Sequence, residues 1–234
     1  MIDPGRSTAH AWSRIGHRNG AQPRVASTRL RIACAGAGGH GKVVADAALA
    51  LGRDEVVGFL DDNPELTGRR VIGLQVLGPI ALWRDLQIDV LIPAIGANRT
   101  RRDIMLREQS RGATAMTIVH PSAMVSAFAS LQAGVVVLAG AVINAGATID
   151  DDVIVNTGSI VEHDCQVGSH AHIAPGCCLG GEARIGEGTL LGIGSRILPG
   201  IKVGVWCVVG AGAVVTKDVE DFATVVGIPA RRLR

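Results

Sequence analysis

Residues 161–208 read VEHDCQ VGSHAH IAPGCC LGGEAR IGEGTL LGIGSR ILPGIK VGVWCV, and each group of six begins with Val, Ile or Leu. The same period extends without a break from Val119 to Val215, and a small or β-branched residue follows four positions after each aliphatic one. A six-residue period fits neither an amphipathic helix nor a flat strand, whose periods are about 3.6 and 2 residues. It predicts a chain that makes a short strand and turns a corner every six residues, so that three sides close a coil of about 18 residues.

The composition supports a narrow core that is filled by aliphatic side chains. Hydrophobic residues make up 47% of the chain, yet it contains no Tyr, three Phe and three Trp. A net charge of +2 and the lack of an apolar run of about 18 residues disfavour binding to nucleic acid and insertion into a membrane. The five cysteines do not form a disulfide pattern, so a reducing cytoplasm is the expected compartment.

The chain divides into four segments. Residues 1–28 are rich in Gly, Ser, Arg and His and predict a disordered arm. Residues 29–118 predict a small α/β domain, with strands over 30–35, 56–60 and 89–95, a helix over 42–51 and a second helix of about ten residues before Thr114. The repeats predict a parallel β-helix over 119–220, followed by a C-terminal tail over 221–234.

A glycine-rich turn joins the first strand of the α/β domain to its first helix. The turn, Gly36-Ala37-Gly38-Gly39-His40-Gly41, satisfies G-x-G-x-x-G, and Asp61 follows it by twenty residues. Glycines at these positions let the backbone approach a phosphate closely, and the N-terminus of the helix attracts the negative charge. The domain is too short for two mononucleotide-binding halves, so we expect it to bind one nucleotide rather than NAD.

The repeats contain one candidate for acid–base chemistry, Val161-Glu162-His163-Asp164-Cys165. His163 falls at a corner, two positions after an aliphatic residue, so its side chain should point outward. An adjacent carboxylate can fix the tautomer of the imidazole and raise its basicity, as a general base requires. A solvated surface histidine is the alternative. A zinc site shared by His163, His170 and His172 is a weaker one, because these residues occupy different corner positions, and no metal is expected.

Together these motifs resemble the left-handed parallel β-helix acyltransferases of the hexapeptide-repeat superfamily. Within that group they resemble the bacterial sugar acetyltransferases of the bacillosamine, perosamine and sialic acid pathways. The repeat alone indicates only the superfamily, whereas the glycine turn combined with Glu-His-Asp-Cys indicates the subgroup. The matching segments are Gly36–Lys42, Phe59–Asp62, Ala94–Gly96, His120–Ala123, Val161–Cys165 and Val226–Ala230.

The resemblance implies a homotrimer that holds acetyl-CoA between the β-helices of neighbouring subunits, and an α/β domain that binds a nucleotide-linked sugar. By position, His163 corresponds to the general base and Asp164 to the acid that raises its basicity. Contacts with acetyl-CoA are implied for His172, Ile193 and Ala211. Contacts with the nucleotide-linked sugar are implied for Gly38, Gly39, His40, Asp61, Asp62 and Gly96.

The expected function is acetyl-CoA-dependent N-acetylation of the amino group of a UDP- or GDP-linked sugar, by direct transfer with His163 as the base. O-acetylation of a sugar of the sialic acid type is an alternative, because the sequence does not distinguish an amine acceptor from a hydroxyl. A non-catalytic, nucleotide-binding trimeric scaffold is the alternative from a different class of function.

Overall fold

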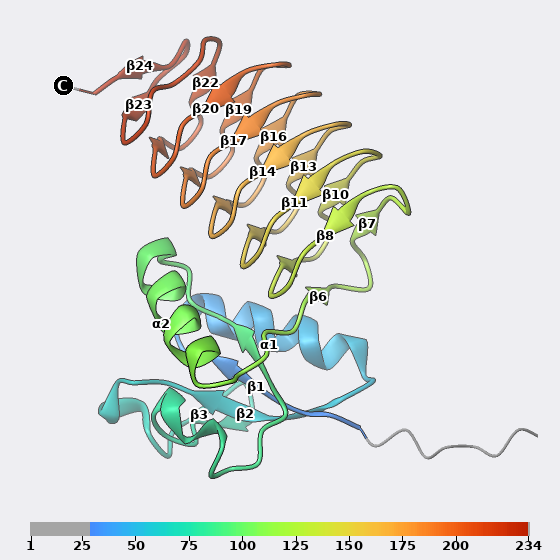
Figure 1. The fold of residues 1–234 in the computed structure, drawn as a ribbon, viewed down its shortest axis with the longest axis vertical. Helices are drawn as coiled ribbons and strands as arrows, with labels where there is room; N and C mark the ends of the chain where they lie inside the picture. The colour runs from blue at the N-terminus through green and yellow to red at the C-terminus, as the bar shows by residue number, and fades with distance from the viewer. Residues whose placement is uncertain (1–28, 234) are drawn as a thin grey trace, which may run out of the picture.

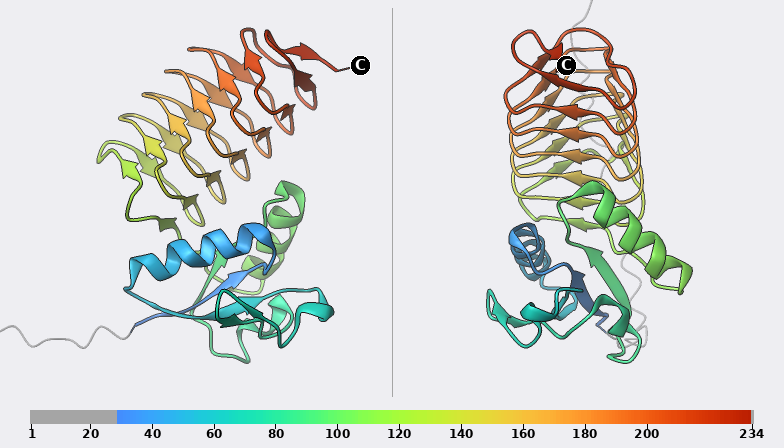
Figure 2. Two further views of the ribbon diagram at one scale, coloured as in Figure 1. Left: turned by 180° about the vertical axis from the view of Figure 1, so that it is seen from behind. Right: turned by 90° about the vertical axis from the view of Figure 1, so that its left-hand side faces the viewer.

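A computed structural model describes residues 29–233, which form a small α/β domain followed by a β-solenoid (Figure 1). The arm predicted over residues 1–28 lies outside the described residues. The coils of the solenoid stack into a column above the α/β domain, as Figure 2 shows from two further directions. Within residues 29–233, no helix is both long enough and apolar enough to cross a membrane.

The α/β domain is built on a three-stranded parallel sheet in the order β2-β1-β5. Two helices of 13 residues each follow β1 and β5, and short 3-10 helices and a hairpin complete the connection between β2 and β5. The elements are β1 Arg31–Ala35, α1 Gly39–Leu51, β2 Glu55–Leu60, η1 Pro64–Leu66, β3 Arg70–Val71, β4 Leu74–Gln75, η2 Ile80–Trp83, β5 Val90–Pro93 and α2 Asn98–Ser110.

Helix α1 begins at Gly39, three residues before the predicted start at Lys42. Glycine has low helix propensity, which argued for a later start. Tertiary packing overrides this preference, because a Cβ on Gly41 would collide with the carbonyl oxygen of Gly36. The glycines therefore let the helix begin directly against the end of β1, as a phosphate-binding turn requires.

The solenoid consists of two-residue strands that recur every six residues. Strands 18 positions apart pair in parallel, as Ile143 does with Val125 and with Val161, so the predicted three-sided coil is confirmed. The strands are β6 Ile118–Val119, β7 Met124–Val125, β8 Ser130–Leu131, β9 Val136–Val137, β10 Val142–Ile143, β11 Thr148–Ile149, β12 Ile154–Val155, β13 Ile160–Val161, β14 Gln166–Val167, β15 His172–Ile173, β16 Cys178–Leu179, β17 Arg184–Ile185, β18 Leu190–Leu191, β19 Arg196–Ile197, β20 Lys202–Val203, β21 Val208–Val209 and β22 Val214–Val215.

The interior of the solenoid is a single aliphatic core. From Val135 to Val215, the aliphatic residue that ends each strand and the small residue four positions later are buried, except for the partly buried Ile201, and Val161 and Cys165 illustrate this at 0% exposure. Hydrophobic burial on all three sides of the prism is therefore what holds the coils closed, since each coil contacts only its neighbours.

The last coil departs from the sequence prediction. Val219 pairs with Val203, only 16 positions earlier, so it occupies an aliphatic position rather than the small-residue position assigned to it from the period. Asp218 stabilises the shorter turn by accepting the backbone N–H of Lys202 at 2.9 Å. Beyond residue 220, where the sequence predicted a tail, β23 (Thr224–Val226) pairs with β21 and then with the antiparallel β24 (Arg231–Arg232).

From Gly134 to Gly212, every corner contains one residue in the left-handed backbone region, three positions after the aliphatic residue, a pattern that the sequence analysis did not single out. Along one edge, here called the glycine edge, this residue is always glycine. The helix edge, next to α2, and the open edge carry side chains at some of these positions. The glycine edge comprises Gly140, Gly158, Gly176, Gly194 and Gly212, the helix edge Gly134, Asp152, His170, Gly188 and Trp206, and the open edge Gly146, Asp164, Glu182 and Gly200.

Candidate active site

The six residues predicted to contact a nucleotide-linked sugar come together in one pocket of about 330 Å³. The pocket lies where β1, β2 and β5 end, which is where ligands bind in open parallel sheets. Six further residues line it that were not predicted as ligand contacts: Gly36, Ile80, Ala94, Ile95, Thr100 and Ile104. Thr100 and Ile104 are four residues apart and share one face of α2, but this spacing by itself does not indicate a pocket.

The carboxylates of Asp61 and Asp62, which line the pocket, form hydrogen bonds with neighbouring parts of the pocket wall. Asp61 accepts the backbone N–H groups of Ala37 at 2.8 Å and Asn63 at 2.9 Å, which ties the glycine turn to the end of β2. Asp62 accepts the N–H of Ile80 at 2.9 Å and pairs with Arg107 at 3.0 Å. A carboxylate can accept about four hydrogen bonds, so both retain acceptor capacity for a ligand.

Two histidines meet where the pocket adjoins the solenoid. The ring centroids of His40 and His172 are 5.7 Å apart. His172 Nδ1 lies 3.2 Å from the carbonyl oxygen of Gly96, so this nitrogen carries the proton, and Nε2 accepts from Asn156 Nδ2 at 3.0 Å. His172, predicted from the resemblance to contact acetyl-CoA, therefore joins the solenoid to the rim of the pocket.

Both of these histidines are held neutral. Burial, followed by the nearby charge of Arg101, lowers the pKa of His40 to about 4. Burial, followed by His40 and Arg101, lowers the pKa of His172 to about 4 as well. Within the described residues, the buried Nε2 of His40 has no hydrogen-bond partner.

The predicted His–Asp pair lies on the open edge of the solenoid. His163 Nδ1 is 2.9 Å from Asp164 Oδ2, and the side chains are 58% and 62% exposed. The hydrogen bond to Asp164 raises the pKa of His163 above its ordinary value. With Nδ1–H donated to the carboxylate, Nε2 has no hydrogen-bond partner among the described residues, so its lone pair can accept a proton.

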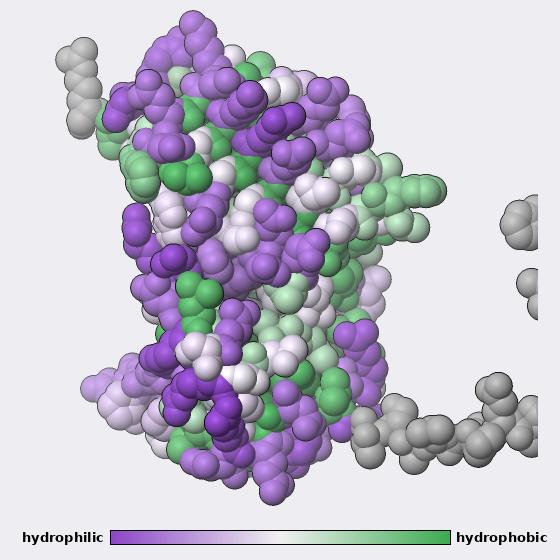
Figure 3. Space-filling model, viewed as in Figure 1, coloured by the Kyte–Doolittle hydropathy of each residue, from purple (hydrophilic) through white to green (hydrophobic). Residues whose placement is uncertain are grey.

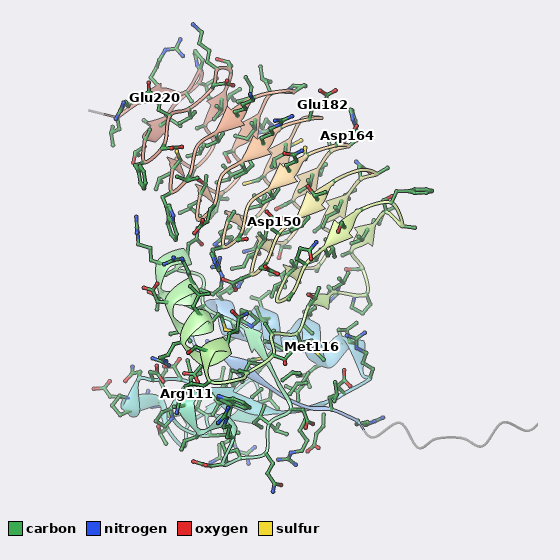
Figure 4. The ribbon with its side chains drawn as sticks, viewed as in Figure 1. Arg111, Met116, Asp150, Asp164, Glu182 and Glu220 are labelled. Atoms are coloured by element: carbon green, nitrogen blue, oxygen red, sulfur yellow. The ribbon has the colours of Figure 1, made fainter. Side chains whose placement is uncertain are left out.

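The pair and the pocket do not meet within one chain. Asp164 and Glu182 lie at the margin of the solenoid away from α2, whereas α2 helps to line the pocket (Figure 4). Ile193, which is 63% exposed, and Ala211 lie at corners of the glycine edge. The pair, the pocket, and the corners with Ile193 and Ala211 thus occupy separate parts of a single chain, whereas His172 lies at the rim of the pocket.

Helix α2 is fixed to the helix edge by contacts that the sequence analysis did not anticipate. The fully buried Arg101 donates to Asp152 Oδ2 at 3.1 Å, to the carbonyl oxygen of His170 at 2.7 Å and to that of Ile95 at 3.1 Å. Farther along, the guanidinium of Arg99 stacks on Trp206 at 4.4 Å from the ring centroid. The pocket rim and the solenoid therefore form one packed unit.

A metal role gains no support from the arrangement of side chains. In the part of the chain that the structure describes, no group of three or more His, Cys, Asp or Glu side chains could hold a metal ion. A larger and shallower hollow of about 500 Å³ lies over β14, β17 and β20, and it contains none of the predicted residues.

Comparison with known protein families identifies both parts of the chain. The PglD N-terminal domain family matches residues 31–107, and the bacterial transferase hexapeptide family matches residues 182–217. A search of curated proteins found no match.

Solved structures resemble the chain over nearly its full described length. A histidine mutant of GDP-perosamine N-acetyltransferase from Caulobacter crescentus, with CoA and GDP-perosamine bound, is 36% identical with a TM-score of 0.83, covering 87% of this chain and 96% of that one. The acetyltransferase domain of PglB from Neisseria gonorrhoeae FA1090, with acetyl coenzyme A, is 39% identical with a TM-score of 0.82, covering 88% and 100%. WeeI from Acinetobacter baumannii AYE is 25% identical with a TM-score of 0.79, covering 87% and 100%.

These similarities extend through the α/β domain and the solenoid together, so they apply to the whole architecture and not to the repeats alone. The chain therefore belongs to the family of left-handed β-helix sugar N-acetyltransferases, and it is an acyltransferase.

Proposed function

We propose that this protein transfers the acetyl group of acetyl-CoA to the amino group of a UDP- or GDP-linked amino sugar. The observation that carries the proposal is the His163–Asp164 pair, in which one ring nitrogen is held by a carboxylate and the other is free. Relatives that share the fold were solved with CoA and GDP-perosamine or with acetyl coenzyme A, which supports the same two substrates here.

The reaction follows from the geometry of the pair. The neutral amine of the sugar attacks the thioester carbonyl of acetyl-CoA, and Nε2 of His163 takes the amine proton as the C–N bond forms. The tetrahedral intermediate then collapses with cleavage of the C–S bond, and the imidazolium returns the proton to the sulfur of CoA. Asp164 holds the ring and stabilises its protonated form, and a backbone N–H at the cleft stabilises the oxyanion.

The pocket of the α/β domain supplies the binding site for the nucleotide-linked sugar in this proposal. The free N–H groups at the start of α1 face the pocket through Gly38, Gly39 and His40, and they suit a diphosphate. Because His40 is neutral, it would donate or accept a hydrogen bond rather than contribute a positive charge. Ile80, Ile95 and Ile104 provide an apolar wall for the base.

A homotrimer completes the site. Since the pocket adjoins the helix edge and His163 lies beyond it, the base of one copy must reach the sugar bound by another. Apolar surface near the first coils suits such an interface: Met124 is 70% exposed and Phe128 is 83% exposed, and an apolar projection is visible beside β7 (Figure 3). Acetyl-CoA would then lie between copies, along His172, Ile193 and Ala211.

The test is release of free thiol from acetyl-CoA in the presence of UDP- and GDP-linked 4-amino sugars, with reactions lacking an acceptor as background. Matched sugars that carry a hydroxyl in place of the amine distinguish N- from O-acetylation. We expect turnover with an amino sugar, a loss of about 10²-fold or more in kcat/KM for His163→Ala, and a mass near three times 24.2 kDa by light scattering.

Three outcomes would contradict the proposal. Absence of turnover with every acceptor would favour the non-catalytic scaffold. Turnover of the hydroxyl sugars alone would favour O-acetylation. A His163→Ala variant as active as the wild type would assign the base to another residue.

A further inference from the structure

The first corner residue of each coil, two positions after the aliphatic residue, tolerates many side chains. From Pro121 to Ala211 this position holds Pro, Ala, Asp, Thr, His, Ser, Glu, Ile and Val, and Gly181 is its only glycine. Gly181 does not lie in the left-handed region, so the backbone places no demand for glycine there. Its missing side chain requires another explanation.

That explanation lies one coil away, because Gly181 follows His163 by 18 positions and the coils stack through the hydrogen bond from Glu182 N–H to the carbonyl oxygen of His163. A Cβ on Gly181 would lie 2.5 Å from Cε1 and 3.1 Å from Cδ2 of the His163 ring, and it would collide with Nε2. The Nε2–Cε1 edge of the imidazole therefore lies in the space that a side chain at residue 181 would occupy.

A second glycine accommodates the carboxylate of the pair from the preceding coil. Gly146 precedes Asp164 by 18 positions, and a Cβ there would collide with Oδ1 of Asp164 and lie 3.2 Å from its Cγ. The pair is thus enclosed by glycines on both sides along the column. Gly146 has a φ of 76° and is also favoured by its backbone conformation, so Gly181 is the informative position.

We propose that Gly181 is a positioning residue for acetyl transfer, because the space left by its missing side chain accommodates the Nε2–Cε1 edge of the His163 imidazole while Nδ1 stays hydrogen-bonded to Asp164. This inference rests on the proposed role of His163. Any side chain at residue 181 would displace the His163 ring from this space. The displacement would break the hydrogen bond to Asp164 and turn the proton-accepting nitrogen away from its position.

Gly181→Ala is the direct test. The variant should fold, since Ala127, Ala133, Ala139, Ala145 and Ala211 occupy the same corner position in other coils. Displacement of a catalytic group by about 1 Å costs about 10²-fold, so we expect a loss of that size in kcat with little change in KM for acetyl-CoA. Ala139→Ser adds one atom at the same position of another corner, and it should retain the wild-type rate.

A second measurement does not depend on acetyl transfer. Proton NMR can follow the titration of the His163 ring, whose signals are assigned by their loss in His163→Ala. The hydrogen bond to Asp164 raises the pKa of His163 in the wild type, so in Gly181→Ala this pKa should fall toward its ordinary value. Ala139→Ser should leave the titration unchanged.

The outcomes separate the inference from the proposed function. If His163→Ala is inactive while Gly181→Ala equals the wild type in both rate and titration, the positioning role is wrong. If the wild type turns over no acceptor, the proposed function fails, and an unchanged His163 titration in Gly181→Ala would also reject the positioning of the ring.

Discussion

The solenoid carries two histidine–aspartate pairs that use the same atoms in different surroundings. On the helix edge, His170 Nδ1 lies 2.8 Å from Asp152 Oδ2, and the side chains are 12% and 5% exposed. On the open edge, His163 Nδ1 lies 2.9 Å from Asp164 Oδ2, and the side chains are 58% and 62% exposed. Similar geometry therefore does not define function, and exposure separates the two pairs.

The partners of each pair explain the difference. Asp152 also accepts a hydrogen bond from the guanidinium of the buried Arg101. The same guanidinium donates to the carbonyl oxygen of His170 and to Oδ1 of Asn98 on α2. The contacts of Arg101 with Asp152 and with the carbonyl oxygen of His170 hold the α/β domain against the solenoid. Asp164 has only His163 as a side-chain partner among the described residues, and Nε2 of His163 is left for chemistry. The buried pair organises the fold, whereas we assign the exposed pair to catalysis.

Both pairs also depend on residues that accept an unfavourable backbone conformation. Asp152, Asp164 and His170 have φ angles of 56°, 59° and 62°, at positions where the glycine edge has only glycine. A left-handed conformation costs a residue with a side chain about 1–2 kcal/mol. At Asp152 and Trp206 the side chain contacts α2, and at Asp164 and His170 it belongs to one of the two pairs.

The largest effect is expected from removal of the cation at the buried pair. Arg101→Ala leaves Asp152 buried without its cationic partner, which should lower the free energy of unfolding by about 3–5 kcal/mol in denaturant titrations. The exposed pair of Arg232 and Glu220 is the control, and Arg232→Ala should cost less than about 1 kcal/mol. Equal losses for the two variants would mean that burial does not distinguish these ion pairs.

The pH dependence of the rate should show that the exposed pair contains the general base. A general base must be neutral, so kcat/KM should rise with pH through the raised pKa of His163, with a midpoint above about 6.5. In Asp164→Asn that pKa returns toward its ordinary value, so the midpoint should move to lower pH and the plateau should fall. Asp150→Asn, a change at an exposed aspartate outside the pair, should leave the midpoint in place. If the midpoint of the pH profile does not move in Asp164→Asn, then Asp164 does not influence the group whose titration controls the rate.

The smallest effect is expected when glycine replaces a residue with a left-handed backbone conformation. The change in the free energy of unfolding should be positive for Glu182 on the open edge and negative for Asp152 on the helix edge. Glu182→Gly on the open edge removes the strain of a φ of 63° but adds flexibility to the unfolded chain, for a net gain of about 0.5–1 kcal/mol. Asp152→Gly makes the same backbone change but leaves Arg101 without its carboxylate, so it should destabilise the protein. Thermal and denaturant unfolding would measure the stability of the two variants. A higher free energy of unfolding in both variants than in the wild type would contradict the prediction.

Much of the architecture and part of the site could be predicted from the sequence. The six-residue period specified the coil because burial of an aliphatic residue at each side is a local and repeated requirement. The His163–Asp164 pair was predictable because the two residues are adjacent, and the glycine turn was predictable because its backbone demands are local. The pocket residues Ile80, Thr100 and Ile104 were not, since no local pattern indicates which side chains converge from distant elements.

The sequence by itself determined the coil, its strand spacing and the neighbours in the chain that could act as base and acid. Only the tertiary structure decided which residues meet across 18 positions or across the two domains: the pair of Asp152 with His170, the support of His163 by Gly181, and the burial of Arg101 against the solenoid. The reason is physical. Periodicity reports which side of the chain is buried, whereas charge, strain and exposure depend on what is packed against that side.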